Sequence, residues 1–487
     1  MLSPLPADRW QFDSAAHLLV RAGFGGKPQE IEKLHSLGLA RAVDSLVNVV
    51  PDQYPIPAWI NPAEQEQVRL RIQAAILPEE KQAIRQVVNQ QFRRDMGDLT
   101  RWWMARMVNT PAPLIEKMTL FWHGHFATSA EKVKPAYKMW LQNETFRQNA
   151  LGNFGHLAKA LSRDPAMMVW LDTIQSKKEH PNENFAREVM ELFMLGEGHY
   201  TEQDVKEAAR AFTGYRIDPV NQSFRFAPAQ FDFAPKNFMG KTGPWNGDQV
   251  LNIILSQPQC ARFISGKIWK FFAYDNPEPK LLDALAAELL NARYELKPLL
   301  KRMFRSEEFY SDKTRNSQVK SPIQFLVQTF RTLPVSLPDA NVLESFFRQM
   351  GQVPFFPPNV KGWDGGKNWI NTATLTFRYK LSRQLVAGIS PQEIGLPKRP
   401  MQAIEAIAPR PTISKPLVVD QIASAEDRNQ PNKLVDKLFV RVFQQSPQSD
   451  IAEKFNNLVS ARELPLADDA IRDLIVLMMT TPNYQVC

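Results

Sequence analysis

The sequence predicts an all-α protein: a large multi-helix domain with irregular Pro/Trp/Gly-rich loops and a small C-terminal helical segment. Apolar residues recur with a helical period along most of the 487 residues, and alternating strand patterns are scarce. Apolar residues make up 44% of the chain, which is enough for a sizeable core. The predicted helices are 62–76, 79–108, 113–127, 145–161, 165–174, 182–195, 202–213, 248–256, 258–273, 279–292, 296–304 and 321–333.

Composition divides the chain into three predicted parts. Residues 1–390 are predicted to form the main helical domain, in which the Pro-, Trp- and Gly-rich stretch 351–371 interrupts the helices. Residues 391–432 contain IGLPKRPMQ and NQPN, which predict a Pro-rich linker or surface wrap. Residues 433–487 are predicted to be C-terminal helices that pack on the main domain.

Two helix starts are marked by capping residues. Thr201 and Asp204 match a capping box, and Gly214 stands where a glycine is expected beyond the helix end. Asp164 matches an N-cap ahead of Pro165 at the first helical position. Capping is therefore favoured over catalysis for both acids.

Bulk features exclude several classes of protein. No stretch approaches the ~20 consecutive apolar residues of a membrane span. Two cysteines, Cys260 and Cys487, exclude a disulfide scaffold and a thiolate metal site. The net charge is +8, but basic and acidic residues are interleaved, so no nucleic-acid partner is expected. The N-terminus lacks a secretory pattern, which predicts a cytoplasmic location for the sequence as given, or a periplasmic one if a leader has been removed.

The stretch NENFAREVMELFMLG, residues 182–196, carries the first candidate site. On a helical wheel Asn184, Arg187, Glu188 and Glu191 share an arc of about 100°, while apolar residues fill about 200°. A surface helix usually shows a narrow apolar stripe on a broad polar face instead. We therefore expect a core helix with one narrow polar strip. The strip is either a functional site or a structural network, and the sequence leaves both open.

The stretch FWHGHF, residues 121–126, supplies two candidate metal ligands. His123 and His125 diverge by about 200° on a regular helix, so both can reach one metal only if Gly124 breaks the helix. Together with Glu188 they would then form a His/Glu site suited to a divalent transition metal such as iron, manganese or zinc. The alternative is that each is an ordinary core histidine.

A third candidate is the loop and helix start at 354–378. Proline and glycine restrict and permit particular backbone angles, so a defined loop is expected. The side chains that could line a substrate cleft there are Lys361, Trp363, Asp364, Trp369, Asn371 and Arg378. The alternative is a rigid loop whose tryptophans fill the core. No GxSxG or Walker A motif occurs in the chain.

Several stretches together resemble a large bacterial family catalogued as domain of unknown function 1800. They are AAHLLVRAGFG (15–25), FWHGHF (121–126), DPAMMVWLD (164–172), NENFAREVMELFMLG (182–196), YTEQDVKEAARAFTGY (200–215) and PPNVKGWDGGKNWINT (357–372). The resemblance implies no reaction. It implies frequent export and a protein partner similar to alkaline phosphatases or sulfatases. Phe231 precedes Asp232 where the family has a His-Asp pair, so any role of that histidine is absent here.

Two functions are compatible with these observations. The leading one is an enzyme with a buried His/Glu/Arg site that performs metal-assisted hydrolysis or oxidation. Its acid/base or ligand groups would be Glu188 and Glu191 with His123 or His125. Arg187 and Asn184 would orient a polar or anionic substrate, and Asp172 would join from a neighbouring helix end. The alternative is a non-catalytic helical scaffold that holds a phosphatase- or sulfatase-like protein or an anionic polymer.

Overall fold

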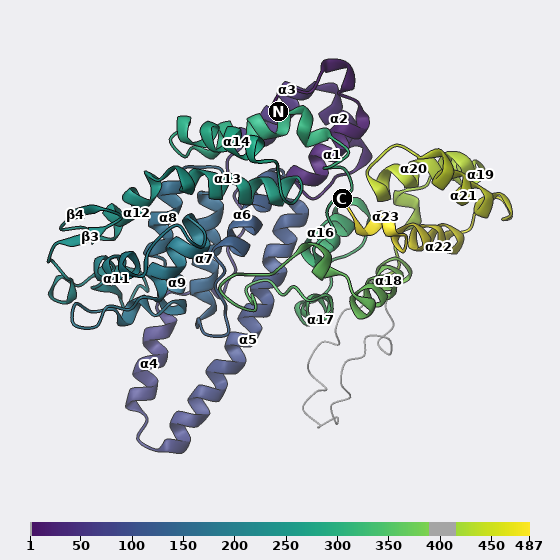
Figure 1. The fold of residues 1–487 in the computed structure, drawn as a ribbon. Helices are drawn as coiled ribbons and strands as arrows, with labels where there is room; N and C mark the ends of the chain where they lie inside the picture. Colours follow the sequence, from purple (N-terminus) through teal and green to yellow (C-terminus); the bar gives the residue numbers. More distant parts are fainter. Residues whose placement is uncertain (1, 389–414) are drawn as a thin grey trace.

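The structure is a computed structural model that describes residues 2–388 and 415–487 (Figure 1). The structure is 62% helical, which confirms the predicted all-α class. Within the described residues, the strands form two antiparallel pairs with three residues in each strand.

The α-helices have the following bounds. In the first part of the chain they are α1 (Phe12–Ala22), α2 (Pro28–Ser36), α3 (Leu39–Val47), α4 (Glu64–Ala74), α5 (Pro78–Asn109), α6 (Pro113–His125), α7 (Ala136–Gln148), α8 (Phe154–Ser162) and α9 (Pro165–Trp170). Next come α10 (Asn184–Glu188), α11 (Glu202–Ala211), α12 (Gly247–Leu255), α13 (Pro258–Phe272), α14 (Pro279–Asn291) and α15 (Leu296–Arg305). The remainder are α16 (Pro322–Thr332), α17 (Ala340–Met350), α18 (Thr372–Ala387), α19 (Ala425–Asn429), α20 (Pro431–Phe443), α21 (Ser449–Ser460), α22 (Asp468–Met479) and α23 (Pro482–Gln485).

Most predicted helices match observed ones to within a few residues, but the predicted helix 145–161 is wrong. The chain forms α7 and α8 there, separated by a turn at 149–153. The side chain of Asn153 accepts hydrogen bonds from the backbone N–H groups of Gly155 and His156, which starts α8 as a new helix. The capping box of Thr201 with Asp204 is confirmed.

The strands lie beside the helix that this capping box begins. β1 (Tyr215–Ile217) pairs with β2 (Phe224–Phe226), with Tyr215 opposite Phe226, and β3 (Lys236–Phe238) pairs with β4 (Lys241–Gly243). Gly214 adopts a φ of +75° just beyond α11, which supports its predicted role in ending that helix.

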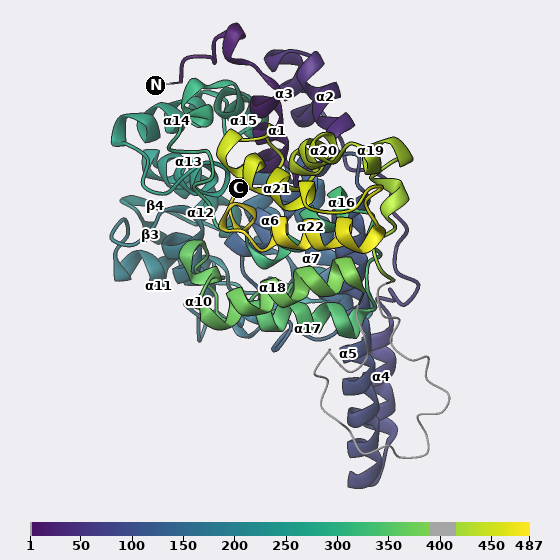
Figure 2. The same ribbon diagram turned by 90° about the vertical axis from the view of Figure 1, so that its right-hand side faces the viewer.

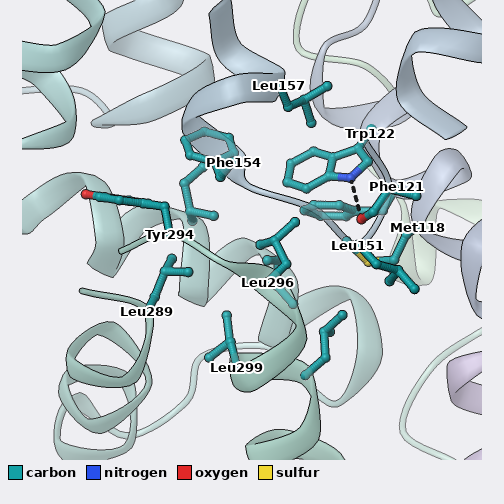
Figure 3. Close-up of a cluster of buried hydrophobic side chains, with 14 of the residues drawn as sticks. Met118, Phe121, Trp122, Leu151, Phe154, Leu157, Leu289, Tyr294, Leu296 and Leu299 are labelled. Atoms are coloured by element: carbon teal, nitrogen blue, oxygen red, sulfur yellow. Dashed lines mark hydrogen bonds between the residues drawn. The ribbon is translucent and has the colours of Figure 1, made fainter. Parts of the chain in front are cut away.

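The first apolar core is enclosed by α1–α3 and by most helices from α6 to α15. Figure 3 shows part of it, where Trp122 packs near Phe154, Leu157 and Leu296. The rings of Trp122 and Phe154 are stacked with centroids 5.8 Å apart. The indole Nε1 of Trp122 donates to the carbonyl of Ala150 at 3.2 Å, so its polar atom is satisfied within the core.

The second apolar core joins the buried half of α5 to α16–α18 and α20–α22. Helices from both sides of the undescribed segment therefore share one core. Of the predicted linker, residues 391–414 lie outside the described residues. The described remainder includes the buried side chains Leu417 and Val419 and the short helix α19. The predicted limits of the three domains stay predictions.

Helix α4 and the first half of α5 form a hairpin that projects from the body of the protein (Figures 1 and 2). At its tip, the side chain of Ile76 is 86% exposed and that of Leu77 is 53% exposed. Further along, α5 enters the second core with Met96, Leu99 and Trp103. This helix therefore extends from solvent into the centre of the molecule.

A buried network of charges joins α5, α6 and α7. Glu116 of α6 is 0% exposed. Its Oε1 accepts from Arg147 Nε at 2.6 Å, and its Oε2 accepts from Arg147 Nη2 at 3.0 Å and from Trp103 Nε1 at 2.9 Å. Arg106 of α5 lies 3.0 Å from the same carboxylate and forms a second ion pair of 3.0 Å with Asp52. The Glu116 network, as we call this set, fixes three helices against one another.

Candidate functional site

The segment with the polar strip is not a single α-helix. After α10 the chain forms a π-helix, η3 (Val189–Met194), in which Leu195 N–H donates to the carbonyl of Met190, five residues earlier, at 2.9 Å. π-helices are rare and frequently occur at functional sites. The predicted helical wheel therefore holds for α10 and fails beyond Glu188, because the π-helix has a wider turn.

Side chains from other helices satisfy carbonyl groups at the end of η3. His125 Nε2 donates to the carbonyl of Phe193 at 2.9 Å, and Gln259 Nε2 donates to that of Leu195 at 2.8 Å. Carbonyl groups near a helix end lack intrahelical partners, so such donors stabilise an irregular end. The packing of α6 and α13 thus supports the π-helix.

The polar strip lies at the border between core and solvent. Phe185 and Met190 are buried on the core side, whereas Glu188 and Glu191 are half-buried. The hydroxyl of Tyr200 donates to Glu191 Oε2 at 2.7 Å. Burial, and next the neighbouring charge of Glu191, raise the pKa of Glu188 above its usual value. The two carboxylates therefore have different environments although they are three residues apart.

Arg187 and Asn184 lie at the outer end of the strip. Arg187 forms a bidentate pair with Glu202, at 2.7 and 2.8 Å, and a longer contact of 3.3 Å with Glu183. The hydrogen bond to Glu202 is the main reason that the pKa of Arg187 is raised. Asn184 is exposed, and its backbone N–H donates to Asn182 Oδ1. The guanidinium of Arg187 is thus already occupied by carboxylates of its own chain.

Asp172 is engaged by groups outside the strip. Its carboxylate accepts from Lys132 Nζ at 2.7 Å and from Gln175 Nε2 at 3.1 Å. Its predicted role beside Glu188 and Glu191 stays a prediction.

The two histidines of α6 face different surroundings. The helix continues through Gly124 and ends at His125, so Gly124 does not break it. His123 Nε2 accepts from the backbone N–H of Phe355 at 3.0 Å, and its ring lies against Trp103 and Trp363. His125 stacks on Phe121 with centroids 5.7 Å apart. Burial lowers the pKa of each to about 3, so both are neutral at pH 7.

This arrangement does not fit the predicted iron, manganese or zinc site. The Nε2 atoms of His123 and His125 are both engaged by backbone groups, and the two rings diverge. In residues 2–388 and 415–487, no group of three or more His, Cys, Asp or Glu side chains is placed to hold a metal ion.

In the Trp-rich loop at 354–371, the residue whose charge acts on the strip is Lys361. Gly362, with a φ of +81°, lies so close to α6 that an added Cβ would be 2.5 Å from the carbonyl oxygen of Gly124. This contact fixes the preceding Lys361, whose charge acts on Glu188 and whose Nζ lies 3.8 Å from Glu197. Trp363 is half-buried against His123.

The other predicted cleft residues are placed differently. Asp364 is exposed and accepts from Asn368 at 3.4 Å, whereas Trp369 is buried at the end of the short helix η6 (Gly366–Trp369). The prediction that Arg378 lines a cleft is wrong, because its side chain is 0% exposed. Arg378 donates to the carbonyl of Lys320 at 2.8 Å and lies over the ring of Phe325.

Sequence reasoning missed Tyr200 and the π-helix. Tyr200 ends the turn GEGHY, nine residues after Glu191, and no helical spacing connects the two positions. A π-helix has no periodic signal when it lasts six residues. The available signal for Tyr200 was its place as the first residue of the motif stretch 200–215, and that does not assign it a partner.

The described elements and the strip define a helical protein whose candidate site is a half-buried carboxylate pair, Glu188 at the end of α10 and Glu191 in the π-helix that follows. No described helix has both the length and the apolar character needed to cross a membrane. The chain belongs to the family described as "Protein of unknown function (DUF1800)", whose model matches residues 17–486. This confirms the resemblance in the sequence motifs. No curated protein and no solved structure matches the chain.

Proposed function

We propose that the protein is a hydrolase whose acid–base groups are Glu188 and Glu191. The observation that carries this proposal is the unequal environment of two neighbouring carboxylates at the junction of α10 and the π-helix. Burial raises the pKa of Glu188, whereas Glu191 accepts a hydrogen bond from Tyr200. Pairs of titratable groups whose environments differ in this way are typical of acid–base catalysis.

The two carboxylates would divide the proton transfers of hydrolysis. Glu188 in its protonated form donates a proton to the leaving-group oxygen as the scissile bond breaks. Glu191 takes a proton from a water molecule, whose oxygen forms the new bond to the substrate. Exchange with solvent then restores both groups. Substrates with an oxygen leaving group, such as esters and glycosides, match this scheme.

Neighbouring side chains would bind the substrate. The charge of Lys361 acts on Glu188, and Trp363, two residues later in the same loop, has a partly exposed ring. Asn184 lies exposed at the outer end of the strip. These groups favour a polar substrate that lies along the strip and contacts the loop.

The test is hydrolysis of a panel of chromogenic esters and glycosides by Glu188→Gln. We expect a loss of about 10²–10⁴-fold in rate relative to the wild type. The matched control is Glu183→Gln, which removes a carboxylate one turn earlier that contacts Arg187. Equal rates in Glu188→Gln and the control would overturn the proposal.

The proposal predicts the direction in which the rate of hydrolysis changes with pH. The proton donor acts only while it is protonated, so the wild-type rate falls as the pH rises through the raised pKa of Glu188. This alkaline limb should be absent from the residual rate of Glu188→Gln. Persistence of the same limb in that variant would assign the donor to another group.

A second function, binding of a protein partner, is favoured by the exposed apolar side chains of the α4–α5 hairpin. Ile76 and Leu77 at the tip, and Leu70 and Val87 along its sides, are all more than half exposed. The family resemblance suggests a phosphatase- or sulfatase-like partner. Ile76→Ser combined with Leu77→Ser should abolish co-elution with such a partner on size exclusion, and unchanged co-elution would refute this role.

A further inference from the structure

A small hollow is lined by residues from both ends of the chain and from the segment 315–328, none of which belongs to the carboxylate strip. It has a volume of about 50 Å³ and lies between α1, the segment before α16, α16 itself and the end of α20. One water molecule needs about 10–15 Å³ of such volume, so the hollow has room for a few waters or one small ion. Its polar lining includes Arg315, Lys320 and Gln328.

Lys320 is the most constrained of these side chains. It is 2% exposed, and its backbone is held by Gln485, whose carbonyl accepts from Lys320 N–H at 2.8 Å. Its ammonium lies 4.0 Å from the ring centroid of Tyr484. No described residue accepts a hydrogen bond from its Nζ. A buried ammonium that has only an aromatic ring as its partner leaves three donors to be satisfied.

Other cations lie around the hollow, and the charge at Cys487, which lines it, acts on Arg21, Lys117 and Lys320. Arg21, Lys117 and Arg378 are buried, and Arg315 lines the hollow. In the described part of the chain, none of these four, nor Lys320, forms an ion pair with an Asp or Glu side chain. Burial lowers the pKa of both Lys117 and Lys320 to about 7, and the charge at Cys487 opposes this shift. The negative charge at Cys487 therefore offsets part of the positive charge of this cluster.

The other polar groups of the hollow include a carboxylate, an imidazole and an amide. Asp13 also lines the hollow, and its Oδ1 accepts from the backbone N–H of Ser446 at 2.7 Å. His17 donates to the carbonyl of Phe309, and burial and the nearby Arg21 lower its pKa well below the usual value, so it adds no charge. Gln328 is 1% exposed, and its Oε1 has no hydrogen-bond donor. Rotation of this amide would present its NH₂ group instead.

We propose that this hollow binds a small oxyanion, a phosphate or carboxylate group, held by the Lys320 ammonium, the Arg315 guanidinium and the Gln328 amide. An anion would supply acceptors for the donors of the Lys320 ammonium, which have none among the described residues. The site is separate from the proposed hydrolase site, and neither proposal depends on the other.

The experiment uses the full chain and measures its Tm at increasing inorganic phosphate, sulfate or acetate, with ionic strength held constant by sodium chloride. A ligand that binds the folded state raises Tm with concentration. We expect a response to at least one oxyanion, confirmed by isothermal titration calorimetry. A stronger response to phosphate and sulfate identifies a tetrahedral oxyanion, and a stronger response to acetate identifies a carboxylate.

Variants assign the response to the hollow. Lys320→Met should weaken phosphate or acetate binding at least tenfold, whereas the control Lys313→Met, at an exposed ion pair with Glu278, should bind as the wild type does. Arg315→Gln, on the half-buried rim, should also weaken binding and serves if Lys320→Met does not fold. The proposal is overturned if no oxyanion raises the wild-type Tm above the chloride baseline. It is also overturned if the folded variants bind as tightly as the wild type.

Discussion

The Glu116 network and the polar strip of α10 and η3 are both built from carboxylates on largely apolar helices, yet they differ in how their oxygens are used. Both oxygens of Glu116 accept hydrogen bonds from Arg147 or Trp103 inside the core. In the strip, the one hydrogen bond to Glu191 from a described residue is that of Tyr200, and both glutamates are half-buried. A saturated, buried carboxylate stabilises helix packing, whereas an open one can receive a ligand.

The largest expected change in the free energy of unfolding comes from removing a charge of the Glu116 network. Glu116→Gln removes the charge that faces Arg147 and Arg106 and leaves two buried guanidinium groups undercompensated. Loss of one partner of a buried pair costs about 3–5 kcal/mol in the free energy of unfolding. Urea denaturation monitored by circular dichroism measures it. A loss below about 1 kcal/mol would show that the network does not stabilise the fold.

A smaller change in the free energy of unfolding is expected from a substitution in the polar strip. Tyr200→Phe removes the hydrogen bond to Glu191 but keeps the ring, so the free energy of unfolding should fall by about 0.5–1.5 kcal/mol. The same denaturation experiment applies. If Tyr200→Phe were as destabilising as Glu116→Gln, the strip would be a structural network like that of Glu116, and the contrast between them would disappear.

The smallest effect is expected at the outer end of the strip. Arg187→Gln removes a surface ion pair with exposed partners, and such pairs contribute about 0–1 kcal/mol. Any loss should shrink further as sodium chloride is raised, because salt screens exposed charges. A larger, salt-insensitive loss would mean that Arg187 is part of the packed core.

Local sequence signals predicted the elements that depend on local chemistry. The helix predicted at 79–108 is α5, Pro78–Asn109, which begins with a proline at its first position. The N-cap role of Asp164 ahead of Pro165 is confirmed, since its side chain accepts from the backbone N–H of Met167. Such features are set by residues within one turn of each other, and a sequence displays them directly.

Features that depend on distant residues were not predictable in the same way. Glu116 and Arg147 are 31 positions apart and lie on different helices, so no periodicity connects them. Arg378 lies in a motif-rich stretch, yet its side chain is buried, where it donates to the carbonyl of Lys320 and lies over the ring of Phe325. The π-helix depends on donors from α6 and α13. For the candidate site, the sequence indicated the polar strip but neither its Tyr200 partner nor its π-helical backbone.

The π-helix has a consequence for insertions and deletions in this segment. Its bond from Leu195 to Met190 spans five residues, one more than an α-helical bond. Deleting Leu192 alone would shorten that span to four and allow an ordinary α-helix, while Glu188 and Glu191 kept their spacing. Residues after the deletion would turn by about 100° relative to α10. At this point of the chain, a change in length by a single residue alters the backbone more than most changes in residue type.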